Sequence, residues 1–255
     1  MDKLHRKLIQ TCMVRRRKID VLSELPSKQR TTLPIQLPPK DMREYEAARK
    51  DFIAWLTKTG AKKGKIRAAT KAQAIVKLGY LKRMVGERKL PLVMEWIDNF
   101  LTQTDEKVIV FAVHKIVVGE LEKRYRKCCV VVDGSTPGKV RQASVHQFQT
   151  DAKCRVFIGN IQAAGVGLTL TAANHVFFAE MGWTPGSMVQ CEDRASRIGQ
   201  TKNVNCYYMI AKGTIEEMLT KLIQKKMKTI TQVLDGEAAE VDFDIFDKLM
   251  KEIRK

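Results

Sequence analysis

Residues 107–113 read KVIVFAV, a stretch that is apolar after its first lysine and rich in β-branched side chains. Four similar stretches follow: Cys128–Asp133 (CCVVVD), Cys154–Ile158 (CRVFI), His175–Glu180 (HVFFAE) and Val204–Ile210 (VNCYYMI). Amphipathic stretches lie between and after them, at 114–127, 137–149, 185–198 and 214–231. Strands that are apolar on both faces and alternate with helices are typical of a parallel sheet covered on both sides. The sequence therefore predicts an α/β fold.

Residues 40–102 have the period of helices instead. One expected helix follows Pro38-Pro39 and has an apolar face made by Tyr45, Ala48, Phe52 and Trp55. Two more are expected around 68–84 and 90–101, after an exposed basic link at 59–65 (TGAKKGK). We therefore expect four parts, which are a connecting segment at 1–33, a basic helical region at 34–103, an α/β core at 104–234 and a tail at 235–255 with a helix near 242–253.

The net charge of +18 is unevenly distributed. Residues 1–90 hold 24 Lys and Arg against 8 Asp and Glu, whereas residues 91–255 hold 22 against 20. Such a basic half favours a polyanionic partner, because Lys and Arg release counterions from phosphates. The alternative is a basic face that is merely solvated or that balances an acidic protein.

Several classes of protein are disfavoured. No apolar run approaches the roughly 20 residues that span a bilayer, and the start, MDKLHRKLIQ, lacks the apolar core of a secretory signal. The six cysteines and four histidines form no C-x-x-C pair and no cluster with zinc spacing. We expect a protein of a reducing compartment, with no membrane contact and no metal site of its own.

Residues 188–201 read MVQCEDRASRIGQT and carry the sharpest chemical pattern. On the expected helix at 185–198, Gln190, Arg194 and Arg197 would share one face. A guanidinium keeps its charge and matches phosphate oxygens with a planar fork, so two of them can stabilise the charge that develops on a γ-phosphate. Glu192 and Asp193 stand beside them and could orient them. The alternative is an ordinary face of surface salt bridges.

This string resembles motif VI of the Swi/Snf-type members of helicase superfamily two, which is usually Q-A-x-D-R-x-H-R-I-G-Q. Gln190, Asp193-Arg194 and Arg197–Gln200 match it. Ser196 stands where histidine is usual, and Cys191 where alanine is common. The family is thought to use that histidine for positioning, so the departure leaves the expected mechanism intact.

Two segments upstream match in the expected order. Residues 162–170 (QAAGVGLTL) resemble motif V, where Gly165 and Gly167 would allow a close backbone approach and a positive φ. Residues 133–149 begin with Asp-Gly-Ser-Thr and resemble motif IVa. There Ser135 and Thr136, with free N–H groups at a helix start, suit a phosphate of the tracked strand, with plain helix capping as an equal alternative.

Other matches extend the resemblance over about residues 10–235. They are the inter-lobe segment from 15 to 28, motif IV at 108–115, the segment FAEMGWTPG at 178–186 and IAKGTIEE at 210–217. Trp183 could contact DNA or pack against the motif VI helix. The wording around motif V and Trp183 is most similar to the annealing-helicase branch, which rewinds or remodels forked DNA.

The resemblance implies a RecA-like C-terminal lobe with an N-terminal helical insertion. The lobe would be half of an ATP-driven translocase on double-stranded DNA, of the chromatin- or fork-remodelling type found in DNA repair. Arg194 and Arg197 would be the catalytic arginines. Residues expected at the nucleotide are Gln190, Asp193, Gly165 and Gly167, and those at DNA are Ser135, Thr136, Arg141, Thr169 and Trp183.

The sequence contains neither G-x-x-x-x-G-K-[ST] nor D-E-x-H after a strand. ATP and Mg²⁺ are therefore expected to bind only together with an N-terminal RecA-like lobe of the same protein, and this chain is expected to be inactive alone. The expected location is the nucleus in a eukaryote and the cytoplasm otherwise. Two alternatives remain, which are another superfamily-two motor such as an RNA helicase, and a non-catalytic module that docks onto nucleic acid or protein.

Overall fold

The computed structural model describes residues 2–14, 16, 18–22, 24–58, 68–165 and 167–224. The basic link at 59–65, the tail at 235–255 with its expected helix, and the end of the helix expected at 214–231 lie outside these residues. The elements in chain order are α1 (Asp2–Thr11), α2 (Lys18–Val21), β1 (Lys28–Ile35), α3 (Pro39–Lys58), α4 (Ala68–Arg88), α5 (Leu90–Gln103), β2 (Val108–Ala112), α6 (Lys115–Tyr125), β3 (Cys129–Val132), α7 (Gly138–Thr150), β4 (Val156–Asn160), α8 (Ile161–Ala164), β5 (His175–Phe178), α9 (Pro185–Glu192) and β6 (Val204–Ala211). Residues 215–224 are also helical.

The strands form one six-stranded parallel sheet in the order β1-β6-β5-β2-β4-β3. The five strands expected from residue 107 onward are confirmed as β2 to β6. The helical insertion is confirmed as well, since α3, α4 and α5 precede β2. Among the described residues, no helix is both long and apolar enough to cross a membrane.

Strand β1 was not expected, because residues 1–33 were interpreted as a connecting segment. It pairs in parallel with β6, from Lys28 opposite Val204 to Ile35 opposite Ala211. Its sequence, KQRTTLPI, is mostly exposed and contains Pro34, which suits an edge strand because one side needs no ladder donors. An edge strand therefore crosses the expected division at residue 33.

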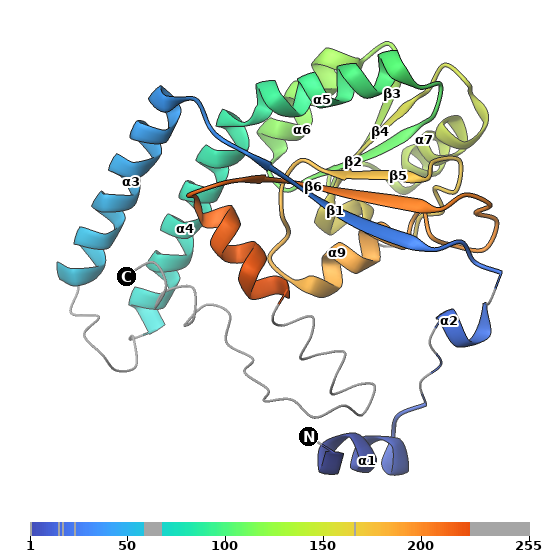
Figure 1. The fold of residues 1–255 in the computed structure, drawn as a ribbon, viewed down its shortest axis with the longest axis horizontal. Helices are drawn as coiled ribbons and strands as arrows, with labels where there is room; N and C mark the ends of the chain where they lie inside the picture. The colour runs from blue at the N-terminus through green and yellow to red at the C-terminus, as the bar shows by residue number, and fades with distance from the viewer. Residues whose placement is uncertain are drawn as a thin grey trace.

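Helices cover both faces of the sheet (Figure 1). Ile109, Phe111 and Phe178 face one cluster, which α7, α8, α9 and residues 215–224 complete. Val108, Val110 and Phe177 face the other, against α5 and α6. This alternation along strands that are buried throughout confirms the two-sided α/β sheet.

Helices α3 and α4 lie together at one end of the sheet (Figure 1). Tyr45 and Phe52 of α3 are buried in a third cluster with Leu78 of α4 and Ile215. The predicted apolar face of α3 is thereby confirmed for its described side chains, although the Trp55 side chain lies outside them. The Tyr45 hydroxyl also accepts from the backbone N–H of Ile215 at 2.8 Å.

A buried ion pair joins this helical region to the sheet. Lys89, between α4 and α5, and Glu216 are both fully buried. The Lys89 Nζ donates to both Glu216 carboxylate oxygens at 2.7 Å and to the Met209 carbonyl at 2.8 Å. Because every donor direction of the ammonium is used, the pair is compensated within the protein.

Another buried lysine, which lies on α4, has no such partner. Lys82 is fully buried, and its Nζ has no hydrogen-bond partner. It lies over the ring of Trp183, 4.4 Å from the centroid. Burial lowers the pKa of Lys82 to about 8, although the charges of Glu180 and Glu216 oppose the shift. The protein therefore holds an ammonium at neutral pH in a place that disfavours its charge.

Removal of one partner from the buried pair should strongly destabilise the fold. We expect Lys89→Met to lower the free energy of unfolding by about 3 to 5 kcal/mol, because Glu216 would remain buried without its counterion. The matched control is Arg83→Met, which breaks the exposed Arg83–Glu87 pair and should change the free energy of unfolding little, because solvent screens that pair. Urea denaturation measures both, and equal losses would contradict the prediction.

Substitution of Lys82 should have the opposite sign. The unfolded state holds the proton up to a pKa of 10.5, whereas the folded state releases it at about 8, so the cost of burial is fully present below pH 8. We expect Lys82→Met to stabilise the protein at pH 7 by on the order of 2 to 3 kcal/mol. The gain should shrink between pH 8 and pH 10.5. Urea titrations at several pH values test this, and a constant difference would be inconsistent with it.

Candidate nucleotide and DNA interface

Helix α9 begins where expected but is shorter than the sequence suggested. Thr184 caps it by accepting from the Ser187 N–H at 3.3 Å, and Pro185 occupies its first turn. The helix ends at Glu192, so the expected extent of 185–198 is wrong. Residues 193–199 form tight turns and end at Gly199, whose φ of 97° few other residues adopt.

Arg194 and Arg197 nevertheless come together, although they do not share a helical face. The Nη1 atoms of both guanidiniums donate to the Leu168 carbonyl at 3.2 Å. Arg194 Nε also donates to the Gln190 carbonyl at 2.9 Å, and Arg197 Nη1 to the Thr169 hydroxyl at 3.3 Å. The turns thus replace the helix as the device that aims both arginines at the loop from 165 to 169.

The two arginines leave positive charge available at this place. Arg197 is exposed, and Arg194 is half-buried. Within the described residues, no ion pair joins either guanidinium to a carboxylate. The pKa of Arg194 is lowered, first by burial and then by the charge of Arg197. Two neighbouring cations without a carboxylate fit an anionic ligand such as a phosphate.

Glu192 and Asp193 do not orient the arginines, contrary to expectation. The Glu192 carboxylate is fully buried and accepts from Arg30 Nε at 2.6 Å and Nη2 at 2.7 Å. Lys28 lies 2.8 Å from Glu192 and 3.0 Å from Asp193, and Lys18 lies 2.9 Å from Asp193. The two carboxylates thus bind strand β1 and the segment before it.

The two glycines of the loop have different roles. Gly165 has a right-handed φ of −69°, so it does not use the freedom to adopt a positive φ. A Cβ on it would lie 2.7 Å from the Ile161 carbonyl oxygen, so a side chain at this position would crowd the end of α8. Gly167 is exposed and has a φ of 75°, as its resemblance implied. Val166 between them lies outside the described residues.

The backbone at Ser135 and Thr136 is not free, which corrects that part of the expectation. The Ser135 N–H donates to the Asp133 carboxylate at 2.9 Å, and the Thr136 N–H to the Asp133 carbonyl at 3.3 Å. Asp133 closes the turn in this way because an Asp side chain readily accepts from the backbone two residues on. The Ser135 side chain remains exposed, in front of α7.

Arg141 forms a hydrogen bond between two segments, whereas Trp183 packs against the core. Arg141 Nη1 donates from α7 to the Ala163 carbonyl at 3.5 Å, and its buried Nε has no partner. Arg141 thus connects α7 to the segment that also holds Leu168 and Thr169. Trp183 is half-buried and packs against two core clusters and Lys82, as in the packing alternative.

Sequence reasoning assigned no role to Gln200. This buried amide donates to the carbonyls of Thr171, Ala173 and Ala195 at 3.0 to 3.3 Å. Its Oε1 accepts from the N–H groups of Thr201 and Lys202 at 3.0 Å. Gln200 therefore fixes the arginine-bearing turns to the segment after Leu168. The R-I-G-Q ending of the motif draws attention to Gln200, but that pattern does not reveal the hydrogen-bond partners of this residue.

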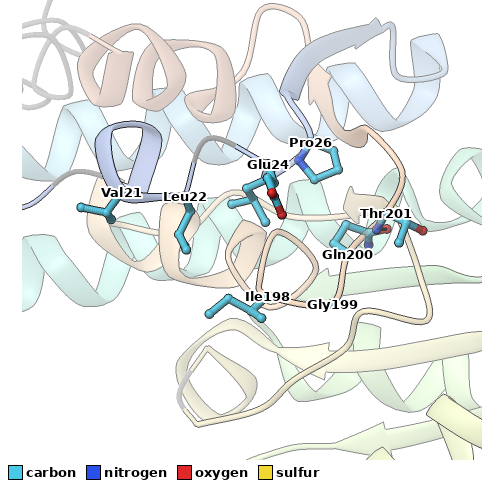
Figure 2. Close-up of a pocket in the computed structure, with 9 residues that line it drawn as sticks. Val21, Leu22, Glu24, Pro26, Ile198, Gly199, Gln200 and Thr201 are labelled. Carbon is cyan, nitrogen blue, oxygen red and sulfur yellow. Dashed lines mark hydrogen bonds between the residues drawn. The ribbon is translucent and has the colours of Figure 1, made fainter.

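A pocket of about 630 Å³ lies beside these turns. Figure 2 shows Val21 and Leu22 of the segment before β1 on one side, and Ile198 with the turn to Thr201 on the other. Ile198 is 74% exposed. Lys18 ties the segment before β1 to Asp193, and Lys28 at the start of β1 binds both Glu192 and Asp193. The pocket lies beside this contact.

Comparison with known proteins agrees with this arrangement. Residues 89–199 match the family described as helicase conserved C-terminal domain. The chain is 36% identical over 258 residues to the DNA annealing helicase and endonuclease ZRANB3 of Mus musculus, covering 97% of this chain and 23% of that protein. It is also 36% identical over 241 residues to the SWI/SNF-related matrix-associated actin-dependent regulator of chromatin subfamily A-like protein 1 of Xenopus tropicalis, covering 93% and 25%. The chain thus spans about a quarter of the length of these relatives.

Solved structures share the fold. The C-terminal part of the Fun30 ATPase domain superposes with a TM-score of 0.68 at 18% identity, over 90% of this chain and 99% of that one. The Sulfolobus solfataricus SWI2/SNF2 ATPase core in complex with dsDNA gives 0.66 at 24% identity, over 91% and 51%. The family match and the sequence relatives show that the chain belongs to the Swi/Snf-type branch of helicase superfamily two, annealing helicases included, and the solved structures show that it has the fold of the C-terminal RecA-like lobe.

Proposed function

We propose that this lobe is the second half of an ATP-driven translocase on double-stranded DNA and that Arg194 and Arg197 act on the γ-phosphate. The observation that carries the proposal is the convergence of two guanidiniums on the Leu168 carbonyl without a carboxylate partner among the described residues. In such a place their charge is available to the three oxygens of a transferring phosphoryl group.

ATP and Mg²⁺ are held largely by a companion N-terminal lobe, because this sequence lacks the phosphate loop and its lysine. On this side of the cleft, Gln190, Gly165 and Gly167 border the nucleotide, whereas the Asp193 carboxylate is bound by Lys18 and Lys28. The fit is one of charge, since two cations meet here and the nearest carboxylates are neutralised by Lys28 and Arg30. Bound Mg²⁺ would neutralise phosphate charge, and the arginines of this lobe would add to that.

The duplex is proposed to lie along the surface that joins α7 to the loop from 165 to 169. Arg141 spans these two parts, and Ser135, Thr136 and Thr169 are proposed to contact the same duplex. Contact through Ser135 and Thr136 requires their hydroxyls to exchange the Asp133 carboxylate for a phosphate. Support comes from the contact of Arg141 Nη1 with the Ala163 carbonyl, which holds this cation between α7 and the loop. Trp183 belongs to this set only as a residue that supports α9 by packing. The biological role follows the relatives, with remodelling of forked or chromatin DNA in the nucleus of a eukaryote.

Removal of Arg197 should abolish hydrolysis without unfolding the lobe. In the protein that carries both lobes, we expect Arg197→Ala to lower the DNA-stimulated kcat for ATP by roughly 10³-fold or more, because the transition state loses one charge-assisted fork. Arg197→Lys should recover only a small part, since an ammonium lacks that fork. Arg83→Ala, at an exposed arginine of α4, serves as the control. Unchanged hydrolysis in Arg197→Ala would rule out the proposed role.

Replacement of Arg141 should weaken duplex binding at every sequence. We expect Arg141→Ala to reduce the dependence of log affinity on log salt by about one phosphate contact. Arg124→Ala on α6, which pairs with Asp98, is the matched control. Fluorescence anisotropy across a salt series gives both values.

Equal stimulation of ATP hydrolysis by duplex RNA would favour another type of superfamily-two motor, and DNA binding without any hydrolysis would favour a docking module.

A further inference from the structure

Two carboxylates stand directly before the arginines in the chain. Asp193 is adjacent to Arg194, and its charge already acts on that guanidinium by raising its pKa against the larger effects of burial and Arg197. A flexible aspartate in this position could pair with an arginine and compete with a phosphate. The structure contains a specific arrangement that prevents this.

Lys28 bridges the two carboxylates. Its Nζ lies 2.8 Å from a Glu192 oxygen and 3.0 Å from an Asp193 oxygen, and only 19% of its side chain is exposed. Burial would lower the pKa of Lys28, but Glu192 and Asp193 outweigh it and raise the pKa. The ammonium is therefore a fixed charge in this contact.

Lys18 completes the contact from α2. Its Nζ lies 2.9 Å from the second Asp193 oxygen and 3.1 Å from the Ser196 carbonyl. Each oxygen of the Asp193 carboxylate thus faces one lysine. The Ser196 contact also attaches the segment before β1 to the turn that carries Arg197.

We propose that Lys28, with Lys18, is a positioning residue that holds Asp193 away from Arg194 and Arg197 and so keeps both guanidiniums available for phosphate. This inference rests on the proposed function, because it concerns the same arginines. It adds a role for the connecting segment, which reaches the arginines without touching them. Displacement of that segment releases Asp193, and the freed carboxylate pairs with the neighbouring arginines.

The test measures how available the guanidiniums are in the 255-residue chain itself. Phenylglyoxal modifies accessible arginines, and peptide mass spectrometry gives the rate at each one. We expect Lys28→Met to slow modification of Arg197 several-fold. Addition of Asp193→Asn should restore the rate, because the freed side chain no longer carries charge. Lys123→Met, which breaks the exposed pair with Glu120 on α6, should leave the rate unchanged.

The rescue separates positioning from a general loss of structure. If Lys28 only stabilised the fold, Asp193→Asn would not restore the rate, and the proposal would be overturned. An unchanged rate in Lys28→Met would overturn it as well. If circular dichroism shows that Lys28→Met is unfolded, the test uses Lys18→Met, since Lys18 is more exposed. We expect a smaller slowing of Arg197 modification in that variant, and no slowing would contradict the proposal. Loss of Arg197 without effect on ATP hydrolysis would instead refute the proposed function and leave the labelling result standing.

Discussion

The buried carboxylate of Glu192 is the constraint around which the candidate site is arranged. A fully buried anion requires counterions and donors, and it receives them from Lys28, Arg30 and the Tyr208 hydroxyl. Burial would raise the pKa of Glu192, but these partners outweigh it and lower the pKa. Because Glu192 ends α9, the same contact fixes where the helix stops and where the arginine-bearing turns begin.

That arrangement explains why Arg194 and Arg197 can lie side by side without a carboxylate to neutralise them among the described residues. Their guanidiniums bind backbone and hydroxyl oxygens of the loop around Leu168, which leave a net positive charge in place. The carboxylates that would cancel it are bound by Lys28 and Arg30 of β1 and by Lys18 of the segment before that strand. Gln200 and Gly165 supply rigidity, the first through its five amide hydrogen bonds and the second through a contact too close for a Cβ.

Much of the fold could be predicted, because strands such as β2 and β5 are apolar on both faces and admit few other interpretations. Strand β1 could not, since an edge strand has no need of that pattern and its partner lies near the other end of the described chain. The resemblance to motifs V and VI indicates that Arg194 and Arg197 lie near the segment with Thr169. The predicted helix is too long because the spacing Q-x-x-x-R-x-x-R fits a helix as well as it fits turns. The partners of Glu192 and Asp193 could not be found, because no periodicity links residue 28 to residue 192. The expectation of free N–H groups at Ser135 and Thr136 is wrong because Asp133 accepts from them only in a particular turn geometry, which composition does not specify.

The pairing of β1 with β6 also has a consequence for synthesis on the ribosome. Strand β1 leaves the exit tunnel before the other five strands of this sheet and can pair with β6 only after they have been translated, so this pairing is among the most non-local steps in folding of the lobe. Until then Glu192 lacks two of its cations, and a nascent chain exposes an unpaired sheet edge at β6. Assembly of the turns that carry Arg194 and Arg197 is thereby tied to the last step in completing the lobe.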